Sequence, residues 1–408
     1  MRATLTRLYR SVAVVMGVSA VAGALTAVSP AAAADTVPGL APLTVSTDRA
    51  GSGDGEIFVA PASGVSDYSS GAEILSSDGR KVLWSHTAAP GTSDADFRRQ
   101  TYRGRPVLTF WEGKGLGGLA TGTDYIYDTE GHEVAEVRAG NGYSADGHEF
   151  QLTSRGTALI VSYAKKTADL TALGGSDHQQ VIDGIVQEVD VRTGKVLFEW
   201  DAAHHVPYSQ SEQPLPASAD TPWDWFHVNA VKQEGNGALL VDARNTWTTY
   251  QIDRRSGDIR WQLGGKKSSF KLKAANGLTL NDADRIFAWQ HDPEPLGNGL
   301  YTIFDNESAG VANTGQDATA ELSYSRTVTV RVDTRAKTAT LVRALDQPSA
   351  GLASSQGNAQ TLANGNQVVG WGSLGAVSEF GPSGRLLFNA SFPAGVVSYR
   401  AYRFDWKH

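Results

Sequence analysis

The sequence predicts an all-β fold, a six-bladed β-propeller of four-stranded antiparallel blades that is closed by pairing of the N- and C-terminal strands. Three observations predict it: a glycine turn followed by an apolar strand recurs six times, a second hairpin follows each copy, and a histidine leads three of the copies. Two hairpins in each period of roughly 50 to 80 residues make one blade. Residues at one repeat position then become neighbours in space.

The first hairpin of each copy has a glycine turn before an apolar strand. These strand starts are 55–59, 104–108, 156–161, 237–241, 299–304 and 365–369. The second hairpin alternates apolar and polar residues on both sides of its turn, as β-hairpins do. These hairpins span 74–84, 125–137, 189–200, 250–261, 330–342 and 377–388. The C-terminal segment 398–404 stands where other copies have their first strand, so we expect it to pair with the strand at Gly55 and remove the free edges.

Long insertions gather on one face of the predicted propeller. In an antiparallel blade, the connection from the second to the third strand and the connection to the next blade lie on the same face, which is also the face where the innermost strand begins. The insertions, which we expect to be loops on that face, are 165–184, 201–224, 263–284 and 306–322. Long loops on a rigid scaffold are a common place for a functional site.

Candidate site residues lie at the strand ends on the same face. His148, His227 and His291 lead three innermost strands, so we expect them to share one site at the mouth of the channel. Arg244 and the pair Asp305-Asn306 follow second strands. The residues expected to bind the ligand of this site are Asn229, Asn306, Asp305, Trp225, Trp247 and Arg400. At the equivalent ring position the other copies place Asp96, Asn358 or its neighbour, and Arg400. The remaining histidines are interpreted as surface residues: His86, His132, His178, His204, His205 and His408.

Several segments around these residues resemble those of bacterial arylsulfotransferases, which are arylsulfate sulfotransferases independent of a nucleotide sulfate donor. The segments are 224–229, 242–247, 259–265, 289–292 and 304–306. The resemblance covers most of the chain after residue 34 and is greatest to a shorter branch of the family. Only about twenty residues precede the first predicted blade, so we expect the family's large N-terminal strand-rich domain to be missing or vestigial.

The resemblance implies a six-bladed propeller that moves a sulfuryl group from an aryl sulfate to a phenol through a sulfated histidine, in two half-reactions. His291 resembles the histidine that becomes sulfated. His148, His227 and Arg244 resemble the surrounding stabilising residues, with Asn229 beside them. The implied partners are therefore a small-molecule aryl sulfate donor and a phenolic acceptor.

The residue types suit this chemistry. A neutral imidazole is a nucleophile, a protonated one can supply a proton to a departing phenolate, and arginine can hold two sulfate oxygens at once. Sulfuryl transfer resembles phosphoryl transfer in needing an in-line nucleophile and positive groups around the equatorial oxygens. Trp225 and Trp247 lie beside these residues in the sequence and could sandwich an aryl ring, although packing between blades would explain them equally well.

Residues 1–34 are predicted to be a secretory signal peptide and 35–408 a single propeller domain. Arg2, Arg7 and Arg10 precede an apolar stretch, and small residues at 30–34 suit cleavage. A transmembrane anchor is the alternative for this segment. No later stretch is apolar enough to span a bilayer, so we expect an exported protein without stable membrane insertion, whether released, periplasmic or wall-associated.

The composition excludes several kinds of chemistry. The chain has no cysteine, which excludes a cysteine nucleophile, a thiolate zinc site and an iron–sulfur cluster. The formal net charge is -7, and removal of the signal peptide makes it more negative, so nucleic acid is not an expected partner. No cofactor or metal is expected, and no oligomeric state is predicted.

Three other functions fit part of the pattern. A three-histidine metal hydrolase would use the same residues. Arg244 argues against it, because a second cation would compete with the metal, and no carboxylate partners for the histidines are evident. A quinoprotein dehydrogenase has turns like 190–195, but such propellers have more blades and frequently a vicinal cysteine pair. A non-catalytic extracellular propeller that binds an anionic aromatic or glycan ligand is the third.

Overall fold

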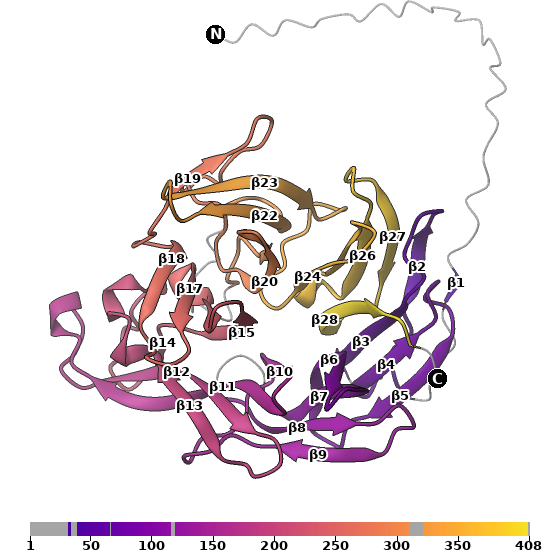
Figure 1. Cartoon of the computed structure of the whole chain (residues 1–408), viewed down its shortest axis with the longest axis horizontal. Coiled ribbons are helices and arrows are strands. Elements are labelled where there is room, and N and C mark those ends of the chain that lie inside the picture. The colour runs from indigo at the N-terminus through magenta and orange to yellow at the C-terminus, as the bar shows by residue number, and fades with distance from the viewer. Residues whose placement is uncertain (1–31, 34–38, 66, 116–118, 311–320, 407–408) are drawn as a thin grey trace, which may run out of the picture. The chain divides into compact units, whose positions relative to one another are not determined.

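The computed structural model describes residues 32–33, 39–65, 67–115, 119–310 and 321–406. These residues form six antiparallel sheets arranged in a ring, with short 3₁₀ turns and no α-helix (Figure 1). The predicted six-bladed β-propeller is confirmed. The predicted signal peptide lies outside the described residues, except for the two-residue strand β1 (Ala32–Ala33). No helix in the described part of the chain is long and apolar enough to cross a membrane.

Each blade has four principal strands, which follow one another from the channel outward, and all predicted strand starts and hairpins fall within them. Blade one comprises β28 (Val396–Phe404), β3 (Glu56–Ser63), β4 (Gly71–Leu75) and β5 (Val82–Thr87). Blade two comprises β6 (Ser93–Tyr102), β7 (Arg105–Lys114), β8 (Thr121–Tyr127) and β9 (Glu133–Val137). Blade three comprises β10 (Phe150–Leu152), β11 (Thr157–Ala168), β12 (Gln179–Asp190) and β13 (Val196–Asp201).

The other three blades continue in chain order. Blade four comprises β15 (Val228–Glu234), β16 (Ala238–Ala243), β17 (Thr248–Asp253) and β18 (Ile259–Gly264). Blade five comprises β20 (His291–Gly297), β21 (Leu300–Asp305), β22 (Arg326–Asp333) and β23 (Thr338–Asp346). Blade six comprises β24 (Asn358–Thr361), β25 (Gln367–Gly370), β26 (Ala376–Phe380) and β27 (Leu386–Ser391).

The two ends of the chain close the ring twice. As predicted, the C-terminal strand β28 pairs antiparallel with β3, with Tyr402 opposite Phe58. In addition, β2 (Thr44–Asp48) pairs antiparallel with β27 and extends the outer edge of blade six. Each terminal segment therefore covers an edge that would otherwise expose unpaired backbone groups.

Parts of the predicted loops are strands. In segment 165–184, β11 and β12 stay paired from Thr157–Asp190 out to Ala168–Gln179, so only 169–178 connect them. Within segment 201–224, β14 (Trp223–Asp224) pairs parallel with β12, and within 263–284, β19 (Lys271–Ala274) pairs parallel with β23. These segments are polar, so the sequence did not identify them as strands, but pairing satisfies their backbone groups.

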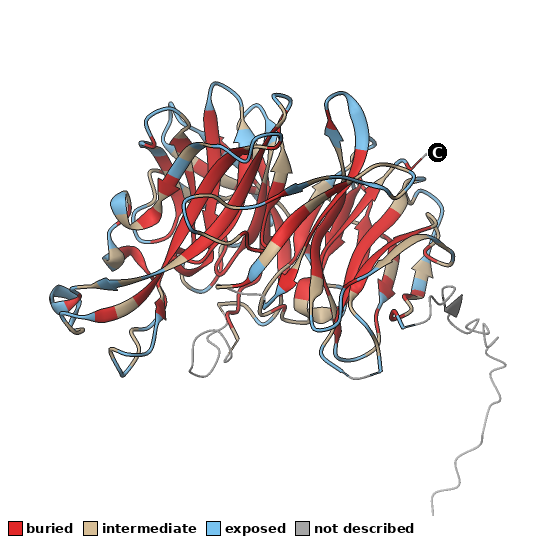
Figure 2. Ribbon diagram, turned by 90° about the horizontal axis from the view of Figure 1, so that it is seen from below, coloured by how far each residue is buried: buried red, intermediate tan, exposed pale blue. Residues whose placement is uncertain are grey.

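The hydrophobic core consists of layers between neighbouring blades rather than one central cluster. Figure 2 shows the buried residues running along the strands, with exposed residues mainly at the loops on both faces. The layer between blades three and four contains Trp200, Trp225 and Tyr250, and the layer between blades one and two contains Phe58 and Phe97. The channel itself is therefore free to hold polar side chains.

Side-chain amides join innermost strands of adjacent blades, which have no shared backbone ladder. Asn358 of β24 accepts a hydrogen bond from Ala401 N (2.9 Å) and donates one to Ala401 O (2.8 Å). Gln360 pairs in the same way with both backbone groups of Arg403. Gln100 of β6 contacts β10 similarly. These amides fix the spacing of the strands that carry the candidate site.

Replacement of Phe58 by alanine should lower the free energy of unfolding by about 3–5 kcal/mol, because it leaves a cavity where the chain ends meet. Phe58 is fully buried, and its ring lies 5.4 Å from that of Phe97 and 5.2 Å from that of Phe404. Urea unfolding measures the change. Val65, 40% exposed, is the control, and its alanine variant should stay within about 0.5 kcal/mol of wild type. Equal losses in both variants would contradict this account of ring closure.

Candidate active site

The three predicted histidines meet where the innermost strands of blades three, four and five begin. His148 lies two residues before β10, His227 immediately precedes β15, and His291 is the first residue of β20. They are 3%, 1% and 1% exposed, and one ring nitrogen of each lies within 4.8 Å of the others. The rings of His148 and His227 meet edge to face with centroids 5.0 Å apart. The structure thus brings all three histidines together.

Two of the imidazoles are oriented by carboxylates. Asp146 contacts Nδ1 of His148, and Asp224 contacts Nδ1 of His227. Because an ionised carboxylate only accepts hydrogen bonds, Nδ1 carries the proton in each neutral ring and Nε2 keeps its lone pair. The sequence-based view that the histidines lack carboxylate partners is therefore wrong. The available signal was an aspartate two residues before His148 and three before His227.

An asparagine orients the third imidazole. Asn306 donates from Nδ2 to Ala353 O (2.8 Å) and Gln356 O (3.0 Å), so its Oδ1, 2.8 Å from Nδ1 of His291, is the acceptor. This places the proton of His291 on Nδ1 and the lone pair on Nε2. The backbone N–H of Gln356 donates to that Nε2 at 3.2 Å. Gln356 follows no motif in the sequence that would have marked it as part of the site.

Burial and a nearby cation keep two of the histidines neutral. Burial lowers the pKa of His227 to about 4, the charge of Arg244 acts in the same direction, and Asp224 only partly opposes them. Burial and then Arg244 also hold the pKa of His291 well below its usual value, with Asn306 opposing. Both rings are therefore unprotonated at neutral pH, the state in which imidazole is nucleophilic.

Arg244 is placed by the turn that follows β16. Its backbone N–H donates to His227 O (3.0 Å), and its Nε donates to Asn245 Oδ1 (2.9 Å). Asn245 in turn donates from its backbone N–H to Phe226 O (3.1 Å), which fixes the turn against the segment before His227. Within the described part of the chain, the Nη groups of Arg244 make no hydrogen bond to protein. They are thus available to bind the oxygens of an anion.

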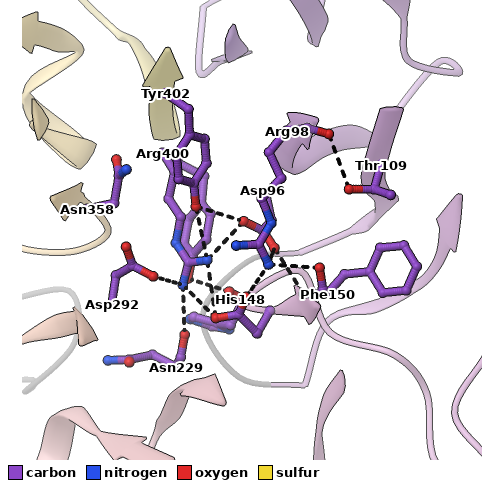
Figure 3. Close-up of polar contacts among 12 residues, drawn as sticks. Asp96, Arg98, Thr109, His148, Phe150, Asn229, Asp292, Asn358, Arg400 and Tyr402 are labelled. Carbon is purple, nitrogen blue, oxygen red and sulfur yellow. Dashed lines mark hydrogen bonds and ion pairs between the residues drawn. The ribbon is translucent and has the colours of Figure 1, made fainter. Parts of the chain in front are cut away.

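Arg400 lies between Asp96 and Asp292, with Asn229 and His148 close by (Figure 3). Its Nη1 lies 2.9 Å from Asp96 and 3.3 Å from Glu149, and its Nη2 lies 3.2 Å from Asp292 and 3.3 Å from Asn229 O. Glu149 follows His148 in the sequence, and Asp292 follows His291. Arg400 therefore holds the strands that carry the histidines, and its predicted contact with substrate stays a prediction.

Lys232 and Arg98 extend this buried network. Lys232 Nζ lies 2.9 Å from Glu149, 2.7 Å from Asp292 and 2.7 Å from Glu294, and Arg98 also pairs with Glu149. Burial acts to raise the pKa of Glu149, but the surrounding cations lower it to about 2. We call this network, comprising Arg98, Lys232, Arg400 and the four carboxylates of Asp96, Glu149, Asp292 and Glu294, the channel network.

Two predicted substrate-binding residues brace the segment before His291. Asn229 donates from Nδ2 to Gln290 O (2.7 Å). Asp305 accepts from Ala288 N (3.0 Å) and pairs with Arg326 Nε at 2.9 Å. A direct contact of Asn229 or Asp305 with substrate stays a prediction.

The predicted tryptophans pack into two separate groups. Trp225 is fully buried against Tyr208, with ring centroids 4.7 Å apart. Trp247 packs against Trp289, which precedes His291 by two residues, at 5.3 Å. The sandwich around an aryl ring is therefore untested for both residues.

Two tyrosines that the sequence did not single out contact the histidines. The ring centroid of Tyr163 lies 5.8 Å from those of His148 and His227. The ring of Tyr399 lies 5.6 Å from that of His148, and its hydroxyl donates to His148 O at 3.1 Å. They are found on β11 and β28, where a tyrosine carries no distinguishing pattern.

A cavity lies elsewhere, at the end of the channel formed by the far halves of the innermost strands. It measures about 780 Å³ and is lined by the far halves of five innermost strands, including Arg99, Gln151, Glu294 and Gln360. Tyr402 lines it and bonds Asp96 of the channel network. The channel network therefore separates this cavity from the histidines.

The protein should lose stability as the pH falls because of His227. An unfolded histidine has a pKa near 6.5, whereas folded His227 has a pKa of about 4. Below pH 6.5 the unfolded chain therefore binds a proton that the folded protein does not, so the free energy of unfolding is highest above pH 6.5 and decreases as the pH falls toward 4. The loss reaches up to about 3 kcal/mol. In urea unfolding, His227→Asn should flatten the pH dependence, and the exposed control His132→Asn should not. An unchanged slope in His227→Asn would refute the assignment.

Replacement of Arg400 by methionine should destabilise the protein by about 3–5 kcal/mol, because three buried carboxylates lose a cation. Arg400→Lys should retain part of that stability, since it keeps the charge but not the fork geometry. Arg138→Met is the control, because the side chain of Arg138 is 64% exposed and its ion-pair partner among the described residues is Glu136. Urea unfolding of the three variants tests this. A methionine variant as stable as wild type would show that the channel network does not hold the strands.

Comparison with known proteins identifies the family. The family model for arylsulfotransferase (ASST) matches residues 98–393. No curated protein matches the chain.

Three of the solved structures that match have low identity and TM-scores below 0.5, and they carry no argument about function. A Bacteroides caccae protein of unknown function is 12% identical over 85% of this chain and 98% of its own, with a TM-score of 0.46. A Lactobacillus plantarum protein is 9% identical over 86% and 99%, with a TM-score of 0.42. A europium-containing methanol dehydrogenase is 11% identical over 89% and 69%, with a TM-score of 0.38. Because the family model covers more than half of the sequence, the chain belongs to the arylsulfotransferase family.

Proposed function

We propose that this protein moves a sulfuryl group from an aryl sulfate ester to a phenolic acceptor through a sulfated His291. Membership of the arylsulfotransferase family supports sulfuryl transfer in general. His291 is chosen because segment 289–292 resembles the one that carries the sulfated histidine of this family, and the observation that supports it is its hydrogen bond to Asn306, which leaves Nε2 as the unprotonated nitrogen in a ring whose pKa is well below its usual value. Nε2 of His291 is thus a nucleophile at neutral pH.

In the first half-reaction, the Nε2 lone pair of His291 attacks sulfur and the bond from sulfur to the aryl oxygen breaks. The phenolate leaves with the electron pair, and the sulfuryl group stays on Nε2. The backbone N–H of Gln356 must leave Nε2 for this to occur, because both use the same lone pair. Asn306 Oδ1 continues to accept the hydrogen bond from Nδ1–H and so offsets the positive charge that develops on the ring.

Arg244 supports the transition state in this proposal. Its Nη groups have no partner in the described part of the protein, and its charge already acts on His227 and His291. A guanidinium can hold two sulfuryl oxygens at once, and one well-placed donor is worth about 3 kcal/mol in a transition state.

His148 and His227 handle the proton in this scheme. The acceptor phenol must lose one proton in the second half-reaction, and the departing phenolate of the first needs one. His227 has a pKa of about 4, so its resting Nε2 is free to accept a proton rather than supply one. The phenolate of the first half-reaction therefore leaves as an anion and takes its proton from water. In the second half-reaction, Nε2 of His227 accepts the proton of the acceptor phenol as the phenol oxygen bonds to sulfur and the bond from sulfur to Nε2 of His291 breaks, and His227 then returns that proton to water.

The protein is proposed to act outside the cytoplasm. Support comes from residues 1–34, where arginines precede an apolar stretch and small residues. The absence of cysteine means that export would not add disulfides.

A three-histidine metal hydrolase is the second candidate, and a specific observation favours it. The ring nitrogens of His148, His227 and His291 lie close enough to hold a metal ion, and each Nδ1 has an oxygen partner as zinc-binding histidines usually do. Against it stands Arg244, whose charge lowers the pKa of His227 and His291 and would also repel a cation.

Incubation with a chromogenic aryl sulfate and a second phenol tests the proposal. We expect sulfate on the acceptor, and in the absence of acceptor we expect one SO₃ group on His291 in peptide mass spectra. His291→Asn should lower transfer by at least about 1,000-fold. His132→Asn, whose side chain is 78% exposed, is the matched control and should keep full activity.

Three outcomes would contradict the proposal. Transfer that stops on chelation and returns with added metal supports the hydrolase-type metal site. Binding of aryl sulfate without any transfer by wild type supports the non-catalytic propeller. Transfer by His291→Asn at the wild-type rate excludes His291 as the nucleophile.

A further inference from the structure

A second group of potential ligands lies at the junction of blades one and two. His86 is on β5, Asp94 near the start of β6 and Glu112 near the end of β7, and one ligand atom of each lies within 4.8 Å of the others. We call these residues the blade-junction cluster. The prediction that His86 is a surface residue is wrong, because its side chain is only 22% exposed and its ring packs 4.8 Å from that of Phe110.

The cluster carries more negative charge than its protein partners neutralise. Asp94 is fully buried, and its Oδ2 lies 2.8 Å from Nδ1 of His86. Its Oδ1 is also buried and has no hydrogen-bond partner in the described part of the chain. Neither Asp94 nor Glu112 forms an ion pair with any lysine or arginine among the described residues. A buried, partly unsatisfied carboxylate is costly unless a cation compensates it.

Glu112 is positioned to complete a cation site. Its Oε1 accepts hydrogen bonds from Thr92 Oγ1 (3.0 Å) and Ala89 N (3.2 Å), which fixes the carboxylate. Its Oε2 faces the imidazole, 3.8 Å from Nε2 of His86. The side chains of His86 and Glu112 are 22% and 17% exposed, so water can fill the remaining coordination positions.

We propose that the blade-junction cluster binds a divalent transition-metal ion, for which Zn²⁺ is the probe. One imidazole and two carboxylates are a common ligand set for such ions. Zinc–ligand bonds of about 2.0–2.2 Å place ligand atoms roughly 3.3 Å apart. Asp94 Oδ2 and Nδ1 of His86 are already close enough, and the ion would replace the proton that they share. Glu112 faces the other ring nitrogen, Nε2, so its side chain must turn toward Asp94 to join the same ion. With His86 neutral, the two carboxylates balance the charge of the ion.

The bound ion joins three strands of two blades. These are blade one, where the C-terminal strand β28 closes the ring, and blade two, which is the next blade along the chain. A chain without cysteine has no disulfide to cross-link this junction, and a metal ion bound only by the folded state stabilises it in proportion to its affinity.

Titration calorimetry with Zn²⁺ on chelator-treated full-length protein tests the proposal. Glu112→Gln keeps the shape of the side chain but removes the ligand charge, and we expect it to weaken binding of one Zn²⁺ at least about 10-fold. Glu136→Gln, at an exposed ion pair with Arg138, is the matched control and should bind as wild type does. Zn²⁺ should also raise the thermal unfolding midpoint of wild type and of Glu136→Gln, but not that of Glu112→Gln.

The three-histidine site requires its own variant in the same titration. His227→Asn should keep the Zn²⁺ equivalent that Glu112→Gln loses, because the two clusters do not share a ligand. The proposal is overturned if wild type binds no Zn²⁺ at micromolar concentrations, if Glu112→Gln binds with unchanged affinity, or if only His227→Asn loses the ion. None of these readouts depends on sulfuryl transfer, so failure here leaves the proposed reaction unaffected.

Discussion

The buried channel network is the constraint on which the site depends. Innermost strands of a propeller belong to different sheets, so no backbone ladder fixes one against the next. Arg400 and Lys232 supply that link by contacting Glu149 and Asp292, each of which follows a histidine of the site. A shift of either strand would leave a buried charge without its partner, which costs several kcal/mol. The positions of His148 and His291 are thus set by the residues next to them.

The same charges shape the protonation of the site. Arg400 and Lys232 form ion pairs with carboxylates, whereas the guanidinium of Arg244 hydrogen-bonds only to the amide oxygen of Asn245 in the described part of the protein, although the charge of Asp224 acts on it. The charge of Arg244 also acts on the histidines, and together with burial it lowers the pKa of His227 and His291. Neutral imidazoles beside a guanidinium that forms no ion pair among the described residues suit the anionic substrate of the proposed reaction. Asp146 and Asp224 fix the tautomers of His148 and His227, and their negative charges do not cancel the suitability of the site for an anion.

The fold could be predicted because turns and alternation are local signals. Each glycine turn and each hairpin repeats in the sequence, and the repeat also predicted that His148, His227 and His291 are neighbours. Strand β19 could not be predicted, because its pairing with β23 depends on a partner more than sixty residues away. Gln356 could not be predicted either, because it contacts His291 through its backbone N–H, and the identity of its side chain does not reveal such a contact.

Arg400 shows where reasoning from repeats reaches its limit. Its repeat position correctly placed it in the central ring, and an arginine near three histidines suggested a contact with an anionic substrate. The structure surrounds it with Asp96, Glu149 and Asp292, so its Nη donors are already used, and only its buried Nε lacks a hydrogen-bond partner among the described residues. Arg244, at the end of a second strand, keeps its Nη groups free of protein partners in the described residues. Two arginines of one ring thus differ in what they can bind, and the difference comes from the carboxylates beside them.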